Sequence, residues 1–244
     1  MRAALLTLST LVLAACNMTA DAQRGEAAPA TGAGTERSYQ VAAFDQVSLG
    51  GPHNVIVTVG GPPSVRAEGE ERELERLEIR VEGGRLHIGQ REGSSWSLRG
   101  HDSAVTVHVT VPALSKAAIG GSGDMRIDTV QGRAFEASIG GSGDMEIGSL
   151  RVEDARFSVA GSGNIRVAGQ AARSHATIAG SGDIDASTLE SRTAEVSVVG
   201  SGDVSVRATE TADVSVMGSG DVTVAGPARC TVRKMGSGEV NCNA

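Results

Sequence analysis

The sequence has few aromatic side chains, with one Trp, one Tyr and three Phe among 244 residues. Aromatic residues fill irregular space in ordinary globular cores, so their scarcity argues against a large core of that kind. The chain is nevertheless 40% hydrophobic, which is too apolar for a disordered segment. We therefore expect a narrow, regular interior that small aliphatic side chains can fill.

Basic residues are also in deficit. The chain has 22 Lys and Arg residues against 29 Asp and Glu residues, a net charge of −7. A phosphate backbone or an anionic membrane surface attracts a protein through its basic residues. The acidic balance therefore disfavours nucleic acid, or an anionic membrane surface, as the main partner.

Long apolar runs are absent except near the N-terminus. Residues 3–13 are rich in apolar side chains, follow Arg2 and lead into Leu-Ala-Ala-Cys at positions 13–16. The run is too short to span a bilayer and reads as an export signal over residues 1–15. A Cys directly after Leu-Ala-Ala resembles a bacterial lipobox, which predicts lipidation of Cys16 and an acyl anchor in the membrane. The alternative is an ordinary signal peptide cut at an Ala-x-Ala-like site.

Residues 16–38 follow the signal. Beyond Cys16 they have low hydrophobicity and no periodicity, so we expect a lipidated Cys and a flexible tether. Asn17, and not Asp, follows the Cys, which favours the outer membrane over retention at the inner one. The sequence thus predicts a cell-envelope protein, an outer-membrane lipoprotein, and leaves its periplasmic or surface orientation open.

An internal repeat is the strongest signal in the chain. Seven tetrapeptides of the Gly-Ser-Gly-Asp type occur at spacings of 20, 20, 19, 20, 18 and 18 residues. They begin at Gly121, Gly141, Gly161, Gly180, Gly200, Gly218 and Gly236. Self-similarity at a fixed period is typical of repeat architectures.

Apolar residues alternate with polar ones on both sides of each tetrapeptide. This period of two predicts strands with one buried face. We expect each unit to consist of a strand, a tight turn, a second strand and a looser return of six to eight residues. Stacked units would form an all-β fold, a β-solenoid (single-stranded β-helix) with about 18–20 residues per rung over residues 117–244. The alternative is an antiparallel meander of Gly-Ser-Gly hairpins.

Residues 39–116 lack the repeated turn but still show strand patterns, so we expect an N-terminal β region with atypical first rungs. Gly83-Gly84 predicts a hairpin turn, and the charged residues 68–76 predict one helical turn. The irregular residues 92–103 hold the only Trp, Trp96. Trp96 is a candidate binding anchor, with a packed lid as the alternative.

Three residues of the last repeat unit indicate that the stack of rungs ends there. Lys234 occupies a column position that is apolar in the six earlier units, and a charge there blocks edge-to-edge association. Cys230 and Cys242 fall on inward-facing columns of the same rung. In an exported protein we expect them to form a disulfide.

One acidic or amide residue follows each Gly-Ser-Gly. The column consists of Asp124, Asp144, Asn164, Asp183, Asp203, Asp221 and Glu239. A carboxylate ladder next to glycines could bind Ca²⁺, although that ion takes six to eight oxygen ligands. We favour a structural role in which these side chains accept hydrogen bonds from turn amides.

No pattern indicates catalysis. The five histidines show no metal-ligand spacing, and no serine lies in a Gly-x-Ser-x-Gly context. The outward residues of the repeat are mixed in sign, whereas glycoside hydrolysis needs paired carboxylates. We therefore predict no enzyme activity, no cofactor and no metal site.

Three stretches resemble a known family. They are residues 44–50 (Phe-Asp-Gln-Val-Ser-Leu-Gly), residues 111–114 (Val-Pro-Ala-Leu) and residues 119–124 with the serial turns that follow. Together with the lipoprotein signal they look like the head GIN domain family of auto-transporter adhesins, over about residues 40–242. The resemblance implies a β-helical fold and an envelope location, and it brings no catalytic residues.

The favoured hypothesis for function is a noncatalytic envelope lipoprotein whose rigid solenoid serves as an adhesion or binding surface. Its partners would be the lipid membrane, through the acyl anchor, and a glycan or an envelope protein. One alternative is a structural or stress-related envelope component without external ligand. The other is a carbohydrate-active β-helix enzyme.

Overall fold

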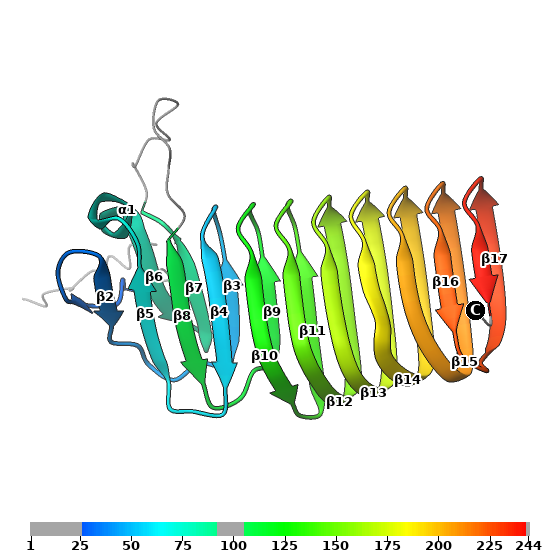
Figure 1. Ribbon diagram of the computed structural model, residues 1–244, viewed down its shortest axis with the longest axis horizontal. Helices are drawn as coiled ribbons and strands as arrows, with labels where there is room; N and C mark the ends of the chain where they lie inside the picture. The colour runs from blue at the N-terminus through cyan, green and yellow to red at the C-terminus, as the bar shows by residue number, and fades with distance from the viewer. Residues whose placement is uncertain (1–25, 92–104, 243–244) are drawn as a thin grey trace, which may run out of the picture.

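The computed structural model describes residues 26–91 and 105–242, and these residues form an elongated stack of strands (Figure 1). Strands make up 67% and helix 3% of the chain, and the strands form a β-solenoid of about 6 turns. The predicted all-β class is therefore confirmed. Cys16 and Trp96 lie outside the described residues. None of the helices in the described part is long and apolar enough to cross a membrane.

The middle of the stack consists of four long strands, each of which makes one rung. They are β12 (Met145–Gly161), β13 (Ile165–Gly180), β14 (Ile184–Gly200) and β15 (Val204–Gly218). Neighbouring rungs pair in parallel, so that Met145 lies opposite Ile165 and Ile165 opposite Ile184. Parallel pairing confirms the solenoid and shows that the antiparallel alternative is wrong for the repeat.

The same stack continues with shorter strands. These are β9 (Lys116–Ile119), β10 (Met125–Gln131), β11 (Ala134–Ile139), β16 (Val222–Ala225), β17 (Arg229–Gly236) and β18 (Val240–Cys242). The expectation of a looser return is wrong for the long rungs, because Arg151, Gln170 and Glu190 of the return pair in register. Nearly equal rung lengths allow the returns to stack, and small register shifts, such as that between Ala186 and Glu190, absorb the differences.

The core lies between the flat sides of the coil. At the first six turns the residue two before the turn is buried, for example Ile139, Val159 and Ile178, and so is the residue four after it, for example Met145 and Ile165. Phe135 and Phe157 are the largest fully buried side chains. Stacked columns of buried side chains thus fill the narrow interior that the composition predicts.

The turn glycines are required by the closeness of adjacent rungs. A Cβ atom at Gly163 would collide with the carbonyl oxygen of Gly143 and with Ile139 Cγ2. Gly200 also has a φ of 133°, a backbone conformation that L side chains rarely adopt. The Gly-Ser-Gly signature is therefore a packing requirement of the stack.

One N-terminal rung is inserted out of chain order. It consists of β3 (Gln46–Leu49) and β4 (Asn54–Val59). β3 pairs with both β7 (Arg85–Gln90) and β9, and β4 pairs with both β8 (Thr106–Val111) and β10. The chain therefore forms this rung before most strands of the N-terminal end. It then continues into β9 and β10, which pair with the other side of the same rung.

Residues 50–53 are the turn of the inserted rung. Leu49 lies opposite Ile119 and Val55 opposite Met125, and Gly123 donates its N–H to the Gly51 carbonyl at 2.9 Å. Gly-Gly-Pro-His-Asn at 50–54 thus corresponds to Gly-Gly-Ser-Gly-Asp at 120–124. The prediction that residues 39–116 lack the turn is therefore wrong at residues 50–53. There Pro52 and His53 stand in place of the Ser and the second Gly of the motif.

Antiparallel strands and a helix cover the N-terminal end. The elements are β1 (Ala30–Thr31), β2 (Glu36–Tyr39), β5 (Ser64–Glu68), α1 (Glu71–Arg76) and β6 (Leu77–Glu82). β6 and β7 form the predicted hairpin, with positive φ at Gly83 and Gly84, and α1 is the predicted helical turn. Leu74 of α1 and Tyr39 of β2 are buried, so this end protects the edge of the solenoid.

Candidate functional site

The column of acidic residues forms a continuous ladder of hydrogen bonds. At each step the Oδ1 atom of one residue accepts the backbone N–H of the column residue on the next rung, as from Asp144 to Asp124 at 2.9 Å. The donors that follow are Asn164 (3.0 Å), Asp183 (3.0 Å), Asp203 (2.9 Å), Asp221 (2.8 Å) and Glu239 (2.7 Å). These hydrogen bonds join different rungs. Each side chain therefore accepts from an amide of the next rung, and not from an amide of its own turn as local capping would require.

A second set of bonds runs in the opposite direction. Met145 donates its backbone N–H to the Asn164 carbonyl at 2.8 Å, and Ile165 donates to the Asp183 carbonyl at 2.9 Å. Each pair of rungs is thus joined twice at this corner, once through a side chain and once through the backbone. The side-chain acceptor satisfies an amide that the curved backbone leaves without a strand partner.

Each hydrogen bond of the ladder in the described residues uses the Oδ1 atom of the accepting side chain. Among residues 26–91 and 105–242, no three His, Cys, Asp or Glu side chains gather as a metal-binding group. One carboxylate per rung supplies few of the oxygens that Ca²⁺ needs. The structural role of the ladder stays the favoured prediction, with Ca²⁺ binding as the alternative.

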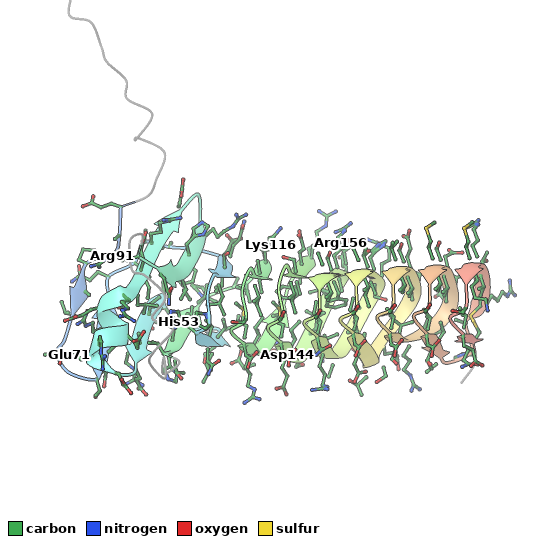
Figure 2. The ribbon with its side chains drawn as sticks, turned by 90° about the horizontal axis from the view of Figure 1, so that it is seen from above. His53, Glu71, Arg91, Lys116, Asp144 and Arg156 are labelled. Atoms are coloured by element: carbon green, nitrogen blue, oxygen red, sulfur yellow. A yellow bond between two sulfur atoms is a disulfide. The ribbon has the colours of Figure 1, made fainter. Side chains whose placement is uncertain are left out.

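A groove with a volume of about 730 Å³ runs along the solenoid beside the ladder. One wall is the ladder from Asp124 to Asp203, and the other is the outward column of the following strands. That second column consists of Ile56, Arg126, Glu146, Arg166, Asp185 and Ser205. Figure 2 shows Asp144 on this side of the molecule, with Lys116 and Arg156 on the opposite side.

Ion pairs join neighbouring rungs in the second wall. Arg126 Nη2 lies 2.8 Å from Glu146 Oε2, and Arg166 Nε lies 3.7 Å from Asp185 Oδ2. The Ser187 hydroxyl donates to Asp185 Oδ1 at 2.6 Å. Hydrogen bonds from Ser187 and the charge of Arg166 lower the pKa of Asp185 despite its partial burial. The groove is therefore lined by acidic and basic side chains that pair across rungs.

The predicted disulfide is present. Cys230 of β17 and Cys242 of β18 are bonded, with Cα atoms 6.5 Å apart. The bond closes the last rung on itself. It lies at the far end of the solenoid from α1 (Figure 1).

His53 is a buried group that sequence reasoning missed. Its side chain is 2% exposed, and neither ring nitrogen has a hydrogen-bond partner in the described part of the chain. Burial lowers the pKa of His53 below its usual value. Its equivalence to Gly123 was the available signal, but Pro52 conceals the turn motif around it.

Three other histidines lie in the described residues, each on a strand. His175 Nδ1 lies 2.9 Å from Glu195 Oε2 on the next rung. His87 and His108 lie on β7 and β8, as predicted. The pKa of His87 is lowered, first by partial burial and then by Arg80 and Arg85.

Comparisons with known proteins agree with this architecture. A family model described as "Putative auto-transporter adhesin, head GIN domain" matches residues 43–228. A search of curated proteins found no match.

Several solved structures share the fold. A "putative adhesin" from Bacteroides fragilis aligns with a TM-score of 0.79 and 23% identity, covering 84% of this chain and 95% of that one. A "putative lipid binding protein" from Parabacteroides distasonis aligns with a TM-score of 0.69 and 24% identity, covering 87% and 97%. A "putative adhesin" from the same species aligns with a TM-score of 0.63 and 22% identity, covering 86% and 97%.

Proposed function

The chain belongs to the head GIN domain family, and we propose that it is a noncatalytic, lipid-anchored envelope protein that uses its solenoid as an adhesion surface. The observation that carries the proposal is the groove along the ladder. It crosses successive rungs from the Thr106 level to the Ser205 level, and hydrogen bonds or ion pairs join neighbouring rungs in both walls. Side chains that already contact a neighbouring rung lose less conformational entropy when a ligand binds.

The charge state of the groove supports binding over catalysis. A glycosidase general acid needs a carboxyl group with a raised pKa. The pKa of Asp185 is shifted down instead, and the acids Glu146 and Asp185 are engaged by arginines. Ionised acceptors and guanidinium donors suit the hydroxyl and amide groups of a glycan or an envelope protein.

Binding assays with matched variants test the groove. The purified protein should bind glycan arrays or bacterial cell surfaces. Paired substitutions Arg126→Ser with Glu146→Ser should weaken that binding, because they remove an ion pair from the groove wall. Arg156→Ser is the control, since Figure 2 places Arg156 on the opposite side. No ligand across broad panels, or equal losses from both variants, would overturn the proposal and leave a structural envelope component.

The anchor and the location are tested separately. The residues concerned, 1–15 and Cys16, lie outside those described. We expect labelled fatty acid to be incorporated into the wild-type protein and not into Cys16→Ser. We also expect added protease to digest the protein on intact cells, and protection from it would contradict the adhesion role.

A further inference from the structure

The last rung differs from the inner rungs in having an open edge. β17 pairs with β15 and β18 pairs with β16, and no other described strand pairs with either one. The inner rungs are paired on both sides. The outer edge of β17 therefore presents backbone N–H and C=O groups that can accept an added strand.

Core positions are also open at this rung. Val232 is 44% exposed, although its partner Val214 one rung earlier is only 2% exposed. At the other end of the solenoid Leu74 and Tyr39 lie over the interior and are buried. In the described part of the chain nothing equivalent covers β17.

The charge of the open rung is opposite to that of the whole chain. Arg229, Arg233 and Lys234 are exposed and form no ion pair with a described residue, in a chain of net charge −7. Three positive charges on one short edge attract an acidic segment. They repel a second copy that docks through the same edge, because the two sets of charges would face each other.

An apolar column borders the open rung on the outside. Val199, Met217 and Met235 lie in register and are 51%, 54% and 69% exposed. The equivalent residues on the preceding rungs are Ala160 and Ala179. Large apolar side chains thus replace small ones only toward the open end, and exposed methionines suit adaptable contacts with a partner.

We propose that the C-terminal rung binds an extended acidic segment of another protein as an added β-strand. The edge of β17 supplies backbone hydrogen bonds, and Arg229, Arg233 and Lys234 pair with its acidic side chains. Met217 and Met235 contact its apolar ones. This site is separate from the groove and does not depend on the adhesion proposal.

The test uses the full chain and a fluorescent synthetic peptide of eight residues in which glutamate and valine alternate. We expect binding, seen as a rise in fluorescence anisotropy, that weakens with added salt. A peptide of alternating lysine and valine should not bind. Absence of binding by the glutamate peptide, or equal binding of both peptides, would overturn the proposal.

Variants locate the site. The double reversal Arg233→Glu with Lys234→Glu should weaken binding by about tenfold or more. Met235→Ser should weaken it less. The matched double reversal Arg151→Glu with Arg156→Glu places the same charges on β12 and should leave binding unchanged. Equal effects of the two double reversals would contradict a site on the last rung.

Two further measurements separate an added strand from simple charge attraction. Hydrogen exchange should slow at β17 amides when the peptide is added and stay unchanged at β13 amides. Uniform exchange rates would contradict strand addition. Sedimentation should show the free chain to be monomeric, and a dimer dissociated by Met235→Ser would identify a second copy as the occupant and overturn the proposal.

Discussion

Asp144 and Asn164 are joined by two hydrogen bonds to the same oxygen atom. Both the backbone N–H and the Nδ2 amino group of Asn164 donate to Asp144 Oδ1, at 3.0 and 2.9 Å. The Oδ1 atom of Asn164 in turn accepts from Asp183. A neutral amide therefore performs the same linking role as a carboxylate, and it adds a donor. The ladder needs an acceptor on each rung more than it needs a charge.

The first prediction separates acceptor from charge at Asp183, whose Oδ1 accepts the Asp203 N–H at 2.9 Å. Asp183→Asn keeps this acceptor and removes one of the stacked charges, so the free energy of unfolding should be unchanged or higher. Asp183→Ala removes the acceptor and should lower it by about 1 kcal/mol. Urea unfolding of both variants measures the difference. Equal destabilisation by Asn and Ala would show that charge is what matters.

The second prediction concerns calcium at the ladder. We expect CaCl₂ to leave the melting temperature unchanged relative to EDTA at the same ionic strength. The ladder oxygens Oδ1 are already bonded to amides, and one carboxylate per rung falls short of a calcium coordination shell. Thermal melts give the answer. A rise with Ca²⁺ that disappears in Asp183→Asn with Asp203→Asn would contradict this expectation.

The third prediction concerns the closeness of the turns. Gly163→Ala should lower the free energy of unfolding by about 2–3 kcal/mol, because its Cβ would strike the Gly143 carbonyl oxygen. Gly132→Ala is the matched control, since no atom lies within 4 Å of a Cβ placed there. Denaturant unfolding compares the two. Similar losses would mean that backbone freedom, and not contact between rungs, requires the glycines.

The sequence predicts the stacked part of the fold well, for a physical reason. A rung of constant length places equivalent residues in columns, so Ile139, Val159 and Ile178 share one environment and show it in sequence. The columns also bring Cys230 and Cys242 to the last rung. Periodicity does not tell which rung a side chain bonds to. The hydrogen bond from Asn164 to Asp144 on the preceding rung could therefore not be predicted from the sequence.

Other features were hidden because they depend on contacts between distant segments. The rung of β3 and β4 lies between strands that follow it in the chain, and no local pattern encodes such an order. His53 occupies a glycine position, and its burial follows from the rungs on either side. The groove was missed for the same reason, since outward residues show no burial pattern.

The fourth prediction is a loss of stability in mild acid that depends on His53. Burial lowers the pKa of His53 in the folded protein below the value of about 6.5 expected in the unfolded chain. Above pH 6.5 both states are neutral and there is no penalty. As the pH falls below 6.5, the unfolded chain binds a proton that the folded one resists, so stability decreases until the lowered pKa is reached.

Urea unfolding between pH 7.5 and pH 5, compared for wild type and His53→Leu, measures this effect. The variant should show a flatter dependence on pH over that range. His175→Gln is the control, because His175 lies on the surface beside Glu195. If the pH dependence of the free energy of unfolding is lost in His175→Gln and kept in His53→Leu, the buried His53 does not cause it.

The last prediction is that the disulfide acts locally. Cys230 and Cys242 are 12 residues apart, and closing a loop of about that size contributes on the order of 3 kcal/mol in the chain-entropy model. In a repeat protein each rung is stabilised mainly by its neighbours. Replacing both cysteines by serine should therefore speed amide exchange in β17 and β18, less so in β15, and leave β12 and β13 unchanged. Adding reductant to the wild type should reproduce this gradient and have no further effect on the variant. A uniform increase in amide exchange along the solenoid would instead mean that the rungs unfold as one cooperative unit. The disulfide would then stabilise all of them.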